Sequence, residues 1–67
     1  MYTLRRAFDN FDNSVYWIVT DESTWRQMHF PAYVFGPARA KEWGMEACRQ
    51  LNAGVDWETV RQEMINK

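Results

Sequence analysis

Hydrophobic and polar residues in the first half of the chain follow the two-residue period of β-strands. Residues 2–8 alternate large apolar side chains with polar or small ones, and Arg6 is the one exception. Residues 14–20 are β-branched or aromatic at nearly every position and predict the strongest strand of the chain. A third strand is expected over residues 25–35. Because proline cannot donate to a β-ladder, Pro31 predicts that this strand lies at a sheet edge or carries a bulge.

Residues that favour tight turns separate the predicted strands. The run Asp-Asn-Phe-Asp-Asn at residues 9–13 predicts a hairpin loop, and Asp-Glu-Ser-Thr at residues 21–24 predicts a second turn. The strand between them, 14–20, is apolar on both of its faces. This pattern is typical of a central strand covered on both sides, or of a strand that offers one free face to a partner.

The second half of the chain changes to the period of α-helices. Gly36-Pro37 predicts a helix start, with proline at the first helical position, and the helix continues over residues 38–53. Its apolar stripe consists of residues spaced i, i+3, i+4, i+7 and i+11: Ala40, Trp43, Gly44, Ala47 and Leu51. A glycine on a buried stripe lowers helix propensity, so we expect Gly44 to allow a close approach to the sheet.

A second helix is expected directly after the first. Gly54 predicts the left-handed end of the first helix, and Asp56 predicts the N-cap of the next. The apolar stripe of this second helix is Trp57, Val60 and Met64. The predicted fold class is therefore α+β: a small antiparallel three-stranded β-sheet followed by two α-helices, in the order β-β-β-α-α, as a single domain over residues 1–67.

The composition restricts the chemistry that the chain can carry. A length of 67 residues allows one small core. The single cysteine, Cys48, excludes an intramolecular disulfide framework, and with the single histidine, His29, it makes a poor zinc site. The spacing of His29, Cys48 and the acidic residues does not indicate a nucleophile with its base. We therefore expect a protein without enzymatic activity, cofactor or metal.

Three features bear on where the protein is found. The longest uncharged stretch, the 12 residues 27–38, is too short to span a bilayer, which takes about 20 residues. The sequence shows no basic-then-apolar leader, so we expect no secretory signal. A lone free cysteine fits a reducing compartment. We expect a cytoplasmic protein.

Acidic residues are unevenly distributed along the chain. The formal net charge of −1 argues against a general nucleic-acid binder. Residues 7–25, however, contain four acids and no Lys or Arg: Asp9, Asp12, Asp21 and Glu22. These acids are either solvated turn residues, or metal ligands that lack the run of a calcium loop, or an acidic patch that imitates phosphates in an arginine-lined channel of another protein.

The chain is rich in aromatic residues, with four Trp, three Tyr and four Phe. Most are needed for the core, and a platform that stacks on the bases of single strands is one alternative use. Because two helices can cover only one face of the sheet, we expect some aromatic area to be exposed as a partner or self-association surface. Trp25 is the predicted anchor and Tyr16 a second contact. The protein is expected to be a monomer or a homodimer.

The whole chain is similar in type to the small single-domain proteins that phages make to disable host systems, anti-CRISPR inhibitors above all. It shares their size, a chain without an enzyme motif, and acids set against an aromatic core. The resemblance implies stoichiometric binding to a larger host protein or ribonucleoprotein complex in the host cytoplasm. Its implied contacts are Asp9, Asp12, Asp21 and Glu22.

A second resemblance covers residues 14–53. The order of two strands followed by Gly36-Pro37-Ala38-Arg39-Ala40-Lys41-Glu42-Trp43 resembles the three-stranded sheet plus helix of phage integrase arm-binding domains. In that family the sheet enters the major groove, which implies DNA contacts by Arg5, Arg6 and Arg26. The sequence thus predicts a non-enzymatic protein-binding module that inhibits a host defence or nucleic-acid-processing complex, with a small DNA-binding domain as the alternative.

Overall fold

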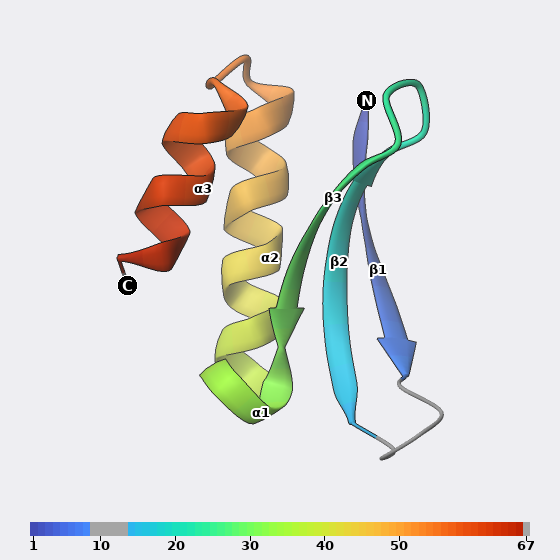
Figure 1. The fold of residues 1–67 in the computed structure, drawn as a ribbon, viewed down its shortest axis with the longest axis vertical. Coiled ribbons are helices and arrows are strands. Elements are labelled where there is room, and N and C mark those ends of the chain that lie inside the picture. Colours follow the sequence, from blue (N-terminus) through green and yellow to red (C-terminus); the bar gives the residue numbers. More distant parts are fainter. Residues whose placement is uncertain (9–13, 67) are drawn as a thin grey trace.

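A three-stranded antiparallel sheet forms one layer of the molecule. The computed structural model describes residues 1–8 and 14–66, in which β1 (Tyr2–Phe8), β2 (Val15–Asp21) and β3 (Arg26–Pro31) pair in the order β1-β2-β3 (Figure 1). The register aligns Leu4, Val19 and Met28 across the three strands. The first two strands confirm the predictions within one residue, and β2 is the central strand.

The third strand is shorter than the sequence predicted. It ends at Pro31, and the next four residues form one helical turn, α1 (Ala32–Phe35). The prediction of a strand to residue 35 is therefore wrong beyond Pro31, although β3 does lie at a sheet edge, as Pro31 predicted. Gly36 closes this turn by donating its N–H to the carbonyl of Ala32, with a positive φ of 87° that favours glycine.

Two longer helices form the second layer. Helix α2 (Pro37–Asn52) begins with proline at its first position and is followed by Gly54 in the left-handed conformation, with φ 97°, as predicted. Helix α3 (Trp57–Ile65) has Asp56 as its N-cap, whose carboxylate accepts hydrogen bonds from the N–H groups of Glu58 and Thr59. These local signals fixed the helix boundaries.

Both helices cover the same face of the sheet (Figure 1). Helix α2 packs on all three strands, whereas the main packing partner of α3 is α2. The buried apolar side chains between the layers form one cluster: Val19, Met28, Phe30, Ala40, Ala47, Leu51, Val60 and Met64. The α+β class is thus confirmed, with α1 as one additional short helix.

Helix α2 approaches the sheet closely at Gly44. A methyl group placed on it would lie 2.8 Å from Leu4 Cδ1 and 3.6 Å from Trp17 Cβ. This contact confirms the expected role of Gly44 and explains a glycine on the buried stripe of a helix. The same methyl group would lie 3.7 Å from Phe30 Cδ2, so bulky side chains of all three strands surround Gly44.

Candidate functional site

The sheet has one open face. The cross-strand rows Arg5–Ile18–His29 and Ala7–Tyr16–Pro31 lie on the side opposite the helices, since Leu4, Val19 and Met28 face the core. No helix in residues 1–8 and 14–66 covers this side (Figure 1). Of the two interpretations of the apolar central strand, the structure selects a strand with one free face.

Aromatic side chains line a depression at one end of this open face. Tyr16 and His29 lie with ring centroids 5.5 Å apart. Together with Ser14, Pro31 and Tyr33 they surround a depression of about 220 Å³. Tyr33 is 75% exposed because α1 carries it out of the sheet. The predicted contact Tyr16 therefore belongs to an accessible aromatic cluster.

Trp25 lies at the opposite end, in the turn between β2 and β3. It is 78% exposed, and its backbone adopts a left-handed conformation with φ 59°. The turn is held by hydrogen bonds to the carbonyl of Asp21 from the N–H groups of Thr24 (3.3 Å) and Trp25 (2.7 Å). Among the described residues, Trp25 is the one non-glycine residue with positive φ. Bulky residues rarely take this conformation, so the turn presents Trp25 at a cost in backbone strain.

Asp21 supports this turn from within. Its side chain accepts hydrogen bonds from the N–H of Ser23 at 3.0 Å and from the Ser23 hydroxyl at 2.8 Å. These bonds lower the pKa of the Asp21 carboxyl, and the N-terminal ammonium, 3.7 Å away, adds to the effect. Asp21 is buried, whereas its neighbour Glu22 is exposed. Of the two acids in this turn, Glu22 is the one available to a partner.

Two of the four predicted acids, Asp21 and Glu22, lie within the described residues. Asp9 and Asp12 lie outside the described residues, in the connection between Phe8 and Val15. Phe8 and Val15 pair at the end of the sheet opposite the Asp21 turn, since the register runs from Phe8–Val15 to Tyr2–Asp21. The seven residues of β2 separate these ends by roughly 20 Å, at about 3.3 Å per residue.

The basic residues assigned to DNA contact are divided between the two faces of the sheet. Arg5 and His29 share a row of the open face, whereas Arg6 and Arg26 lie on the helix-covered side. Arg6 lies over the ring of Phe8 at 5.3 Å, and Arg26 over that of Trp57 at 5.5 Å. The three arginines that the integrase resemblance implies as DNA contacts, Arg5, Arg6 and Arg26, therefore do not share one face of the sheet.

His29 and Cys48 are placed apart as well. The imidazole lies on the open face and contacts Gln27 at 3.1 Å, while the thiol, on α2, donates to the carbonyl of Tyr2 at 3.3 Å. Burial raises the pKa of the Cys48 thiol and so disfavours its nucleophilic thiolate. Within the described part of the chain, no three His, Cys, Asp or Glu side chains gather as metal ligands. No described helix is long and apolar enough to cross a membrane.

A groove between β3 and α3 was not anticipated from the sequence. It has a volume of about 250 Å³ and draws residues from three segments, among them Phe35 of α1 and Arg61 and Ile65 of α3. One signal was present, since Ile65 directly follows Met64 and widens the apolar face of the last helix. The sequence of the helix alone does not show which strand this apolar face lies beside.

Comparison of the chain with protein-family models, with curated proteins and with solved structures finds no match.

Proposed function

We propose that this protein is a non-enzymatic binding module that acts by covering a surface of a larger protein, with Trp25 as its anchor. The observation that carries the proposal is the combination of exposure and strain at Trp25, which is 78% exposed at a positive φ of 59°. Glycine or asparagine would occupy this turn position with less strain. A tryptophan kept there, outside the core, is best accounted for by a contact with a partner.

The support of the turn fits this role. Asp21 and Ser23 fix the turn through side-chain hydrogen bonds, so Trp25 loses little conformational freedom when a partner binds. Exposed Glu22 beside it provides a negative charge for steering toward a basic surface. Tyr16, at the far end of the open face, is a second contact for a partner that spans the sheet.

The most concrete form of the proposal is a phage-type inhibitor of a host defence or nucleic-acid-processing complex in the cytoplasm. Small size, the exposed acid Glu22 beside the turn and the exposed aromatic anchor support it. Binding would occlude the partner stoichiometrically. The division of Arg5, Arg6 and Arg26 between two faces does not favour the DNA-binding alternative, because neutralising a row of phosphates needs cations on one surface.

Affinity capture with paired variants tests the proposal. Tagged protein is incubated with nuclease-treated and untreated bacterial lysate, and the recovered complexes are compared for wild type, Trp25→Gly and Met45→Ala. Met45 is the matched control, since it is an exposed apolar residue (54%) on α2. We expect a discrete protein complex that survives nuclease, is lost with Trp25→Gly and is kept with Met45→Ala. Equal recovery by all three proteins contradicts the anchor, and recovery of nucleic acid that is lost at raised salt favours DNA binding.

A further inference from the structure

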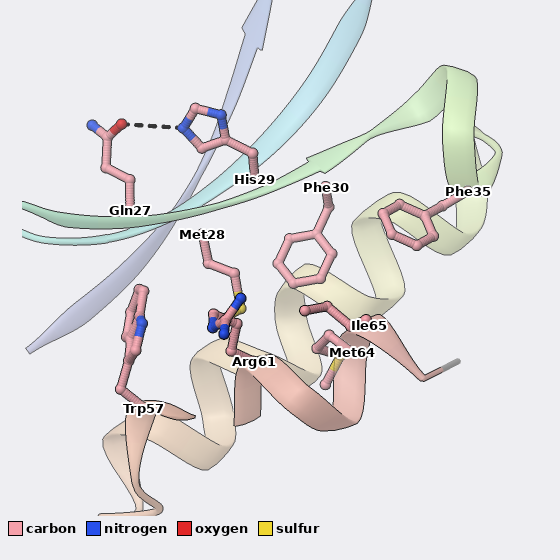
Figure 2. A pocket seen from close by; sticks show the side chains of 9 residues that line it. All are labelled: Gln27, Met28, His29, Phe30, Phe35, Trp57, Arg61, Met64 and Ile65. Carbon is pink, nitrogen blue, oxygen red and sulfur yellow. Dashed lines mark hydrogen bonds between the residues drawn. The ribbon is translucent and has the colours of Figure 1, made fainter. Parts of the chain in front are cut away.

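An apolar groove runs between β3 and α3. Figure 2 shows Met28 and Phe30 pointing from β3 toward the helices, while Met64 and Ile65 of α3 point back toward the strand. The groove has a volume of about 250 Å³ and is open to solvent beside Ile65, which is 61% exposed. Its floor is continuous with the core, since Met28, Phe30 and Met64 belong to the buried cluster.

The free edge of β3 forms one wall of this groove. Four consecutive residues, Gln27 to Phe30, line it, although the side chains of Gln27 and His29 point to the other face of the sheet (Figure 2). These two residues therefore contribute main-chain atoms. Since β3 pairs with β2 on one side only, alternate N–H and C=O groups along its other side are unpaired within the sheet. Four residues provide an edge of about 13 Å.

Helix α3 provides the opposite wall. Its main packing partner is α2, and Trp57 in its first turn stacks on Tyr2 of β1 with ring centroids 5.9 Å apart. Of the α3 residues that line the groove, Arg61 and Ile65 are exposed and border the position that a fourth strand beside β3 would occupy, whereas Met64 is buried in the core. A strand in this position gains main-chain hydrogen bonds from β3 and apolar contacts from α3.

The charges around the groove are predominantly positive. Arg61 lines it, and Arg26 lies beside it, over the ring of Trp57 at 5.5 Å. Glu58 pairs with Arg61 at 3.2 Å and balances one of the two cations. The remaining positive charge favours an occupant that carries an acidic residue.

These charges also argue against a second copy of β3 as the occupant. The strand itself reads Arg-Gln-Met-His-Phe-Pro, with a cation and no acid. Two copies paired edge to edge would bring their Arg26 side chains to the groove with no acid from either strand. Each copy would also present Pro31, which cannot donate to the ladder.

We propose that the β3–α3 groove binds an extended segment of a partner protein, added as a fourth strand beside β3, with apolar residues at alternate positions facing α3 and an acidic residue near Arg26 and Arg61. The inference rests on the proposed function, because the segment belongs to the partner that the module covers. Trp25 directly precedes Arg26, the first residue of β3, so one partner can contact both the turn and the groove.

A selection from random twelve-residue peptides displayed on phage tests the groove without knowledge of the partner. We expect enriched peptides with apolar residues at every second position and at least one acid. Ile65→Arg places a large side chain in the groove at an exposed position and should weaken binding of a selected peptide about tenfold or more. Met45→Arg, on α2 and outside the groove lining, should change the affinity less than about twofold. Arg61→Glu should also weaken binding of the selected peptide, and Trp25→Gly should leave its affinity unchanged.

N-methylation of single residues in the selected peptide tests strand addition directly. Methyl groups on the N–H groups that face β3 should weaken binding about tenfold, and those on the alternate residues should not. Peptides with apolar residues at helical spacing, binding insensitive to Ile65→Arg, or no enrichment at all would overturn the groove. Wild-type dimers that Ile65→Arg separates would overturn the partner segment in favour of a second copy. The Trp25→Gly variant separates the two proposals. It should still bind the selected peptide through the groove, although it no longer captures the partner from lysate through the Trp25 anchor.

Discussion

The carboxylate of Asp21 accepts both available protons of Ser23, the backbone N–H at 3.0 Å and the hydroxyl at 2.8 Å. Hydrogen bonds of this kind stabilise the ionised form, and they hold the pKa of Asp21 below its ordinary value. The ionised carboxylate is therefore part of the turn that presents Trp25. A residue predicted as a partner contact thus has a structural task of its own.

This relationship makes the stability of the fold depend on pH. Because the pKa of Asp21 is lower in the folded state, its ionised form stabilises the fold above the unfolded pKa of about 3.9, and this stabilisation is lost as the pH falls through the lowered folded pKa. We expect Asp21→Asn to be less stable than wild type at pH 7, with a gap that narrows below about pH 4. Urea unfolding at a series of pH values measures it. A gap that stays constant down to pH 2 would remove the Asp21 charge from the turn.

The left-handed conformation of Trp25 predicts an unusual order of stability among its variants. In the interior of a helix or strand, a glycine variant is less stable to unfolding than the alanine variant by about 0.5–1 kcal/mol. At a φ of 59° the order should reverse, because only glycine takes this conformation without a clash of Cβ. We expect Trp25→Gly to exceed Trp25→Ala by about 1 kcal/mol in free energy of unfolding. Chemical denaturation of both variants provides the test, and an alanine variant at least as stable as the glycine variant contradicts the assigned turn.

Local signals explain which parts of the fold the sequence predicts. Pro37, Gly54 and Asp56 act through their own backbone and the adjacent turn, so the helix boundaries follow from neighbouring residues alone. The helical turn at residues 32–35 was missed because Tyr33, Val34 and Phe35 all have high β-propensity. Tertiary packing overrides that propensity, since the ring of Phe35 packs against that of Phe30 with centroids 6.0 Å apart.

The candidate site was predictable only in part. The apolar residues on both faces of β2 left a free sheet face as one of two alternatives, and the prediction of only two helices favoured it. Trp25 was placed at the start of the third strand, but it lies in the preceding turn and is 78% exposed. Successive residues of one strand point to opposite faces, which alone separates Arg5 from Arg6. Whether Arg26 shares a face with either of them depends on the strand register. The β3–α3 groove depends on how far α3 lies from the sheet, and no short-range pattern encodes that distance.

Gly44 and Leu4 provide a test of helix-to-sheet packing. A Cβ at position 44 would lie 2.8 Å from Leu4 Cδ1, so Leu4 must move to accept it. Alanine in place of glycine raises helix propensity by about 1 kcal/mol, and this gain should appear fully only when Leu4 is shortened. We expect Gly44→Ala to be more favourable in a Leu4→Ala background than in wild type, by about 1 kcal/mol in a double-mutant cycle of unfolding free energies. Equal effects in the two backgrounds would place α2 farther from β1.

Cys48 provides a test of the proposal that this protein is not an enzyme. Its thiol is half-buried between α2 and β1 and donates to the Tyr2 carbonyl at 3.3 Å, and burial raises its pKa. Because the thiolate is the reactive form, we expect iodoacetamide to modify the folded protein about tenfold more slowly at pH 8 than the urea-unfolded chain. Mass spectrometry over time measures both rates, and Cys48→Ser is the control for modification elsewhere. Because a nucleophilic cysteine needs a lowered pKa, a folded protein that reacts as fast as the unfolded chain would contradict the inert thiol and reopen covalent chemistry at this position.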